Sequence, residues 1–154
     1  MTAAQRIETL DRSDPAELCA KTDQALTRLV DILSRETMLL RAGKLSDAAG
    51  LAAGKTQAAE DYTVLARAVQ RQAERLHVAI PDQLDRLKRR HESLATQMAE
   101  NLRVLATART VAEDLLADVA RAVGAEQGNK TYGATGATPP AKSQAAGLAI
   151  NRAL

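Results

Sequence analysis

The segment LDRLKRRHESLATQMAENLRVLATARTVAEDLLADVARA, residues 84–122, carries the longest regular pattern in the chain. Positions separated alternately by three and four residues repeat along it without a slip: Leu84, Leu87, His91, Leu94, Met98, Asn101, Leu105, Ala108, Ala112, Leu115, Val119 and Ala122. This heptad spacing places the side chains on one face of an α-helix and indicates packing against other helices. The pattern predicts a helix over residues 82–123, roughly 63 Å long at 1.5 Å per residue.

A shorter helix is predicted upstream. Ser13 or Asp14 can accept hydrogen bonds from the free N–H groups of a first turn, and Pro15 suits that turn. Apolar residues then recur on one face until Gly43, which is typical of a position just past a helix end. The polar residues 1–13 contain no apolar core of a signal peptide, and we expect them to be frayed.

A second helix is predicted from KLSDAAG, residues 44–50, with Ser46 as its N-cap. Gly50 and Gly54 fall in its first turns, and each costs about 1 kcal/mol relative to Ala. This helix is expected to be the weakest of the three. It should end at HVAIPDQ, residues 77–83, where the proline starts the third helix.

The composition favours helices packed without large side chains. Of the 154 residues, 32 are alanine and 20 are leucine, and only 1% are aromatic. A seam between helices can be filled by Leu and Ala, and such a composition is typical of coiled coils and long helices. The predicted fold is therefore all-α: an elongated antiparallel three-helix bundle or coiled coil over residues 14–124, with the third helix the longest.

Residues 125–154 are predicted to form a disordered tail. They are rich in Gly, Pro, Ala, Thr and Ser, and such a segment cannot bury enough apolar surface to offset its ordering entropy. Its end, AAGLAINRAL, is apolar at Leu148, Ile150 and Leu154, yet too short for a stable isolated helix. Tyr132 lies near the start of the tail, outside any predicted core. Tyrosine is a favoured interface anchor, so we interpret Tyr132 as a contact to a partner.

Charge and hydropathy exclude several classes of protein. The net charge is +2, so neither nucleic acid nor anionic membrane is favoured as a partner. No run approaches 18 apolar residues, so no membrane insertion is expected. Together with the absence of a signal peptide, these features predict a cytoplasmic protein.

Three further features have structural interpretations. His91 and Asn101 lie on the predicted seam, where polar residues usually specify register and partner choice. The basic run at residues 86–92 is interspersed with acidic residues and lacks aromatics, which indicates a solvated helix face rather than a nucleic-acid surface. Cys19 is the only cysteine and is expected to act as a small, half-buried apolar residue. We find no catalytic, metal-binding or cofactor-binding motif, so the chain is not expected to be an enzyme.

Several segments follow one another in an order known from one family. Residues 29–62, LVDILSRETMLLRAGKLSDAAGLAAGKTQAAEDY, contain Glu36, a pair of leucines, a turn at Gly43 and, after the helix restart, Lys55. Residues 99–116, AENLRVLATARTVAEDLL, belong to the long third helix and include an asparagine.

The tail adds TYGATGA at residues 131–137 and LAINRAL at residues 148–154. These residues form a Tyr-Gly-x-x-Gly element, a low-complexity spacer and an apolar end that contains Asn-Arg. In that order they follow the helical segments described above. Together these segments resemble the flagellar export chaperones of the FlgN type, which escort hook–filament junction proteins.

The resemblance implies a protein-binding function without chemistry. Such chaperones bind the C-terminal helical segment of a junction protein, prevent its premature assembly and deliver it to the export gate, with the export ATPase as a further candidate partner. The implied substrate-binding region is the end of the third helix with the tail: Ala112, Leu115, Leu116, Val119, Val123, Leu148, Ile150 and Leu154. The implied contact to the export gate is Tyr132.

Other interpretations of the same residues remain open. The chain could be a structural coiled coil that self-associates through its third helix, or a scaffold that binds an unrelated helical partner. A nucleoid- or membrane-associated protein is disfavoured because no basic stripe is present. We expect a monomer when no partner is bound.

Overall fold

The computed structural model describes residues 2–131 of the chain. Six α-helices occur within them: α1 (Ala3–Asp11), α2 (Pro15–Arg41), α3 (Leu45–Ala49), α4 (Ala52–Arg71), α5 (Ala73–Ala79) and α6 (Pro81–Thr131). No strand occurs among the described residues, and the predicted all-α class is confirmed. The chain divides into two compact units, Met1–Asp114 and Leu115–Leu154. α6 contributes to both units.

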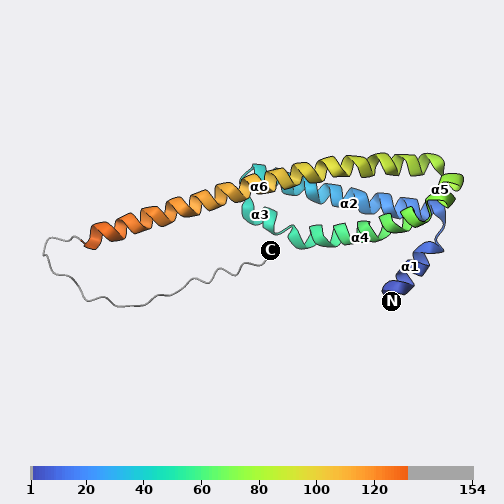
Figure 1. The fold of residues 1–154 in the computed structure, drawn as a ribbon, viewed down its shortest axis with the longest axis horizontal. Helices are drawn as coiled ribbons and strands as arrows, with labels where there is room; N and C mark the ends of the chain where they lie inside the picture. Colours follow the sequence, from blue (N-terminus) through green and yellow to red (C-terminus); the bar gives the residue numbers. More distant parts are fainter. Residues whose placement is uncertain (1, 132–154) are drawn as a thin grey trace. The chain divides into compact units, whose positions relative to one another are not determined.

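Within the first unit, α2, α4 and α6 lie alongside one another (Figure 1). Asp23 of α2 contacts Arg90 of α6, and farther along both helices Glu36 contacts Asn101. α2 and α6 therefore run in the same direction. α4 runs in the opposite direction, because Lys55 near its start reaches Glu36 near the end of α2. The predicted antiparallel three-helix bundle is confirmed.

The predicted limits of the first helix are also confirmed. The Asp14 carboxylate accepts hydrogen bonds from the N–H groups of Ala16 and Glu17, at 3.0 and 3.2 Å, as an N-cap does. At the other end, Gly43 has a φ of 71°, and its N–H donates to Leu40. The next N–H reaches back to Leu39, at 2.9 Å, which completes the hydrogen-bond pair of a Schellman motif.

The second predicted helix is wrong in two respects. It is divided into α3, α4 and α5, and α3 begins after Lys44 without a side-chain cap, so Ser46 is not its N-cap. The first break follows Gly50, whose low helix propensity weakens the chain there. The second break is at Gln72. The side-chain amide of Gln72 donates to the carbonyl of Leu10 in α1, at 3.1 Å.

Within residues 1–13, which the sequence predicts to be frayed, Ala3–Asp11 form the helix α1. Thr2 and Gln5 form a reciprocal capping box at its start. At its end, the Asp11 carboxylate pairs with Arg71 of α4, at 2.9 Å, and Leu10 packs against a buried cluster of the bundle. These partners lie about 60 residues away in sequence, so no local pattern reveals them.

α6 extends farther than predicted. The sequence predicts a helix end at Val123 and a tail from 125, yet α6 continues to Thr131 through Gly124 and Gly128. Glycine ends a helix when it adopts a left-handed conformation, and among the described residues the only glycine with positive φ is Gly43. The predicted tail at 132–154 lies outside the described residues.

The largest buried cluster joins α2, α4 and α6. Its members are Cys19, Leu26, Leu29, Leu33, Ala58, Tyr62, Leu87 and Leu94. Leucine and alanine provide most of its volume, as the composition predicts. Two smaller clusters flank it, one near the start of α2 and one where α2, α3 and α6 meet.

The predicted seam of α6 is right at four positions, Leu84, Leu87, Leu94 and Asn101, which are buried. His91, which the pattern places on the same seam, is exposed. Met98 and Leu105, however, are 44% and 37% exposed, and Val104 is buried in place of Leu105. The buried face therefore lies one residue earlier at this level, where Val104 packs with Leu40 of α2 and Ala48 of α3.

Candidate docking surfaces

The described part of the second unit carries an exposed apolar stripe on α6. Leu115 and Leu116 are 60% and 70% exposed, and Val119 and Val123 are 53% and 49% exposed. Their spacing along the helix places them on one side of it. We call these four residues the α6 stripe. Ala112, the fifth candidate on this helix, belongs to the first unit and is half-buried.

Charged side chains accompany the α6 stripe. Arg121 and Asp118 form an exposed ion pair, and the Arg121 guanidinium also donates to the carbonyl of Ala117. An apolar stripe with charged neighbours is typical of a surface that another helix covers. Tyr132, Leu148, Ile150 and Leu154, the remaining candidates, lie outside the described residues.

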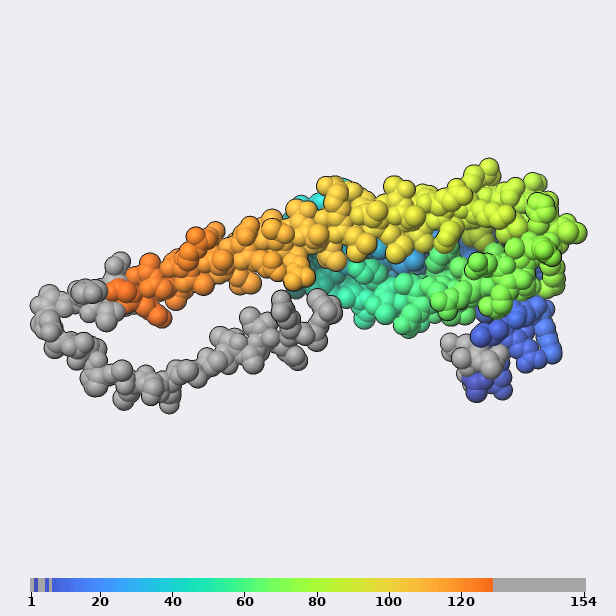
Figure 2. All heavy atoms as spheres, viewed as in Figure 1, coloured from blue at the N-terminus to red at the C-terminus, as the bar shows by residue number. Residues whose placement is uncertain are grey.

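A second apolar surface lies between α4 and α6 in the first unit, and the sequence did not reveal it. It is a groove with a volume of about 560 Å³. Leu29 and Leu33 of α2 contribute to it, and atoms of α2 are visible between α4 and α6 in Figure 2. Val64 of α4 and Met98 and Leu102 of α6 border it, each more than 40% exposed. The spacing of four residues between Met98 and Leu102 could have indicated this surface in the sequence. The heptad pattern, however, assigned Met98 to the buried seam.

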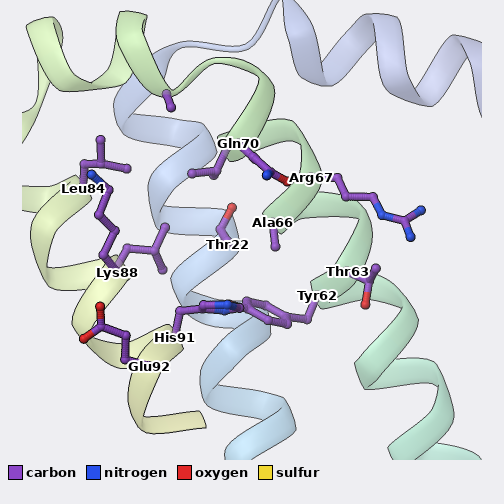
Figure 3. Close-up of a pocket in the computed structure, with 13 residues that line it drawn as sticks. Thr22, Tyr62, Thr63, Ala66, Arg67, Gln70, Leu84, Lys88, His91 and Glu92 are labelled. Carbon is purple, nitrogen blue, oxygen red and sulfur yellow. The ribbon is translucent and has the colours of Figure 1, made fainter. Parts of the chain in front are cut away.

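Tyr62 and His91 connect α4 and α6 beside this groove. The Tyr62 hydroxyl lies 2.5 Å from Nδ1 of His91, and the ring centroids are 5.9 Å apart. Figure 3 shows the two side chains pointing toward one another from opposite helices. They line a cavity of about 470 Å³. Burial raises the pKa of the Tyr62 phenol, and the positive charge of Arg90 partly opposes this.

Asn101 belongs to a buried polar layer with Glu36 and Lys55. Lys55 Nζ donates to both carboxylate oxygens of Glu36, each at 2.8 Å. The Asn101 amide donates to one of these oxygens at 2.7 Å and to the Thr37 hydroxyl at 3.2 Å. The Glu36 side chain is only 5% exposed, so these partners offset the cost of burying its carboxylate.

The basic run and Cys19 have structural roles in the first unit. Arg90 pairs with Asp23 and donates to Thr27 at 2.8 Å, which holds α6 on α2. Cys19 is 4% exposed, more deeply buried than predicted. Burial raises the pKa of its thiol, the carboxylate of Asp23 raises it further, and the charge of Arg86 opposes both.

Among the described residues, no group of three or more His, Cys, Asp or Glu side chains is arranged to hold a metal ion. None of the helices over residues 2–131 has both the length and the hydropathy of a membrane span. The exposed surfaces are apolar faces of helices, and such faces suit the docking of another helix.

Comparison of the chain with models of protein families, with curated proteins and with solved structures finds no match.

Proposed function

We propose that the chain is a cytoplasmic chaperone of flagellar type III export. It binds the C-terminal helical segment of a hook–filament junction protein, keeps that protein from assembling prematurely and delivers it to the export gate, without catalysing a reaction. The supporting observation is the α6 stripe: four large apolar side chains on one helix, each 49% or more exposed. The order of sequence segments that resembles FlgN-type chaperones suggests what covers it.

The size of the α6 stripe limits what it can bind alone. Full burial of a Leu or Val side chain is worth about 1.5–3 kcal/mol, and these four are already partly covered. Covering them fully adds about 1 kcal/mol each, or about 4 kcal/mol in total, whereas micromolar affinity needs about 8 kcal/mol. A chaperone with this stripe therefore needs more contact area.

The tail is the proposed source of the additional contact. Leu148, Ile150 and Leu154 would add a second apolar segment to the substrate site. Tyr132 is the proposed contact to the export gate. Both assignments rest on the sequence resemblance, because these residues lie outside the described part of the chain.

Isothermal titration calorimetry tests the proposal directly. The full chain is titrated with synthetic C-terminal segments of the junction proteins of its host. The double variant Leu116→Gln, Val119→Gln should bind at least about tenfold more weakly, about 1.4 kcal/mol, with an unchanged melting temperature because both side chains are exposed. Val78→Gln is the matched control, since Val78 is 84% exposed on α5 and should leave binding unchanged.

A chain shortened to end after Thr131 separates the contributions of helix and tail. This end retains all of α6, and weaker binding would assign part of the affinity to residues 132–154. If no junction segment binds the full chain, the chaperone function is wrong. Unchanged binding by the double variant would instead remove the α6 stripe from the site.

The α6 stripe also suits a second function, self-association of a structural coiled-coil protein. An exposed apolar helix face can pair with its own copy as readily as with a partner. Sedimentation distinguishes the two, because the chaperone is proposed to be monomeric when free. A mass near twice 16.4 kDa at micromolar concentration, abolished by the double variant, would favour the structural function.

A further inference from the structure

Two hollows between α4 and α6 form one groove in the first unit. The apolar hollow beside Met98 has a volume of about 560 Å³, and the cavity beside Tyr62 and His91 has a volume of about 470 Å³. Thr63 and Arg67 of α4 border both of them. The two hollows therefore continue into one another along α4, and we call them together the α4–α6 groove.

The α4–α6 groove has the length of a short helix. Its lining extends along α4 from Lys55 to Ala73, which is about 27 Å at 1.5 Å per residue. A helix of about 18 residues would fill this length. At the edge of the groove, Val64, Met98 and Leu102 are each more than 40% exposed. A contiguous apolar surface of this kind marks an interaction site.

The contact between Tyr62 and His91 divides the groove into two halves. α4 and α6 run in opposite directions, so the residues that follow Tyr62 lie level with those that precede His91. Arg67 and Lys88 line the groove on that side of the contact. They come from the two opposite walls of the cavity, Arg67 from α4 and Lys88 from α6 (Figure 3). We call this part of the groove the basic half.

The other half of the groove is acidic. Glu60 of α4 and Glu92 of α6 lie on the opposite side of the contact between the two rings. Lys55 also lines this half, but its charge is already paired with the carboxylate of Glu36. The charges of the groove are therefore separated by sign along its length.

The four charges that define the two halves are available to a partner. All four side chains are exposed, and within residues 2–131 none of them forms an ion pair. Glu60 and Arg67 are seven residues apart on α4, about two helical turns. A partner helix is complementary when its acidic and basic residues have a similar separation, and such complementarity determines which partner binds.

Other segments of this chain match the groove less well. Residues 132–154 contain two basic residues and no acidic side chain, so they offer no side chain to the basic half. The α6 stripe of a second copy has charges of both signs nearby. These are already paired within α6, Arg121 with Asp118 and Arg109 with Glu113.

We infer that the α4–α6 groove binds an amphipathic helix of a second protein. The apolar face of this helix covers Met98 and Leu102. Acidic residues at one end of it pair with the basic half of the groove, and basic residues about two turns away pair with the acidic half. The inference goes beyond the proposed chaperone function, because the site uses residues other than the α6 stripe and the partner need not be a junction protein.

Calorimetric titration of the full chain with two synthetic helical peptides tests the inference. Both peptides have about 18 residues and the same leucines at spacings of three and four. The mixed peptide carries glutamates at one end and lysines at the other, whereas the acidic peptide carries glutamates at both ends. The mixed peptide should bind one-to-one and about tenfold more tightly at low salt, because the acidic peptide places like charges at the acidic half.

Exchanging the charge of the acidic half should reverse this preference. Glu60→Lys with Glu92→Lys makes both halves basic, so the acidic peptide should then bind more tightly than the mixed peptide. Asp31→Lys with Glu74→Lys is the matched control. It changes the net charge by the same amount at exposed positions that do not line the groove, and it should keep the preference of the wild type.

The apolar part of the groove is tested by Met98→Gln with Leu102→Gln. Both side chains are exposed at the edge of the groove, so the variant should fold normally and bind the mixed peptide at least about tenfold more weakly. The variant Leu116→Gln, Val119→Gln of the α6 stripe should bind it as the wild type does.

Several results would overturn the inference. They are no binding of the mixed peptide, equal binding of both peptides by the wild type, no reversal in the charge variant, and unchanged binding by Met98→Gln, Leu102→Gln. A dimer that this last variant dissociates would assign the groove to a second copy instead. Tighter binding of the mixed peptide by a chain ending after Thr131 would assign it to residues 132–154.

Discussion

Lys55 of α4 donates to both carboxylate oxygens of Glu36 in α2, at 2.8 Å each, across 19 residues of sequence. The Glu36 side chain is nearly buried, whereas that of Lys55 is 26% exposed. Lys55 therefore supplies the counter-charge of a nearly buried carboxylate, and the amide of Asn101 supplies a further hydrogen bond to it.

Removing Lys55 alone should be costly. Lys55→Met keeps most of the side-chain volume but leaves the buried carboxylate of Glu36 without a counter-charge, which costs about 3 kcal/mol. Urea unfolding followed by circular dichroism measures the loss. Lys88→Met is the control, because Lys88 is exposed and should change the stability by less than about 0.5 kcal/mol. An equal, small effect of both variants would contradict a structural role for the ion pair.

Two glycines should respond in opposite ways to alanine. Gly43 has a φ of 71°, so Gly43→Ala should destabilise the protein by about 1–2 kcal/mol. Gly54 lies inside α4, where an added Cβ would meet only Ile32 Cδ1 at 4.0 Å. Gly54→Ala should therefore stabilise by about 0.5–1 kcal/mol. Thermal melts of the two variants check this, and two shifts of the same sign would refute it.

The Cys19 thiol should be protected in the folded protein. It is 4% exposed, and burial raises its pKa, so little reactive thiolate is present near neutral pH. Labelling with a disulfide reagent at about pH 8 should be roughly tenfold or more slower in the folded chain than in urea. Ser34→Cys in a Cys19→Ala background is the control, because position 34 is exposed and should react at the unfolded rate.

Alkaline pH should weaken the bundle through Tyr62. Burial raises the folded pKa of Tyr62 above its unfolded value of about 10. The corresponding stability is fully present below about pH 10 and is lost as pH rises through the folded pKa. In Tyr132→Phe, where Tyr62 is the only tyrosine, the absorbance of tyrosinate should appear at higher pH in the folded chain than in urea. Tyr62→Phe should lose less stability between about pH 9 and about pH 11.

The sequence predicted the elements whose signals are local. Asp14 and Gly43 were recognisable because capping depends on a few neighbouring residues. The fold class followed from the regular spacing over residues 84–122. That spacing could not decide between Leu105 and Val104, because Val104 is buried by Leu40 of α2 and Ala48 of α3, which are far from it in the sequence.

Contacts between residues that are far apart in the sequence could not be predicted from it. α1 is held by Arg71 and Gln72, about 60 residues away. Because no local pattern shows these contacts, the segment was predicted to be frayed. Glu36, Lys55 and Asn101 were each noticed in the sequence, but nothing in their spacing showed that they form one layer. The groove beside Met98 was missed for the same reason, since residues of α2, α4 and α6 that are far apart in the sequence line it together.

The separation of partners along the chain has a consequence for the order of folding. Glu36 meets Lys55 across 19 residues, but meets Asn101 across 65. Since short loops close at a lower entropic cost, the α2–α4 hairpin should form before α6 joins it. During synthesis at about 5–20 residues per second, the hairpin would wait on the order of 2–9 s between the appearance of Lys55 and that of Asn101. Throughout this interval the leucines that α6 will cover face solvent, so the nascent hairpin is the form of this protein most prone to aggregate.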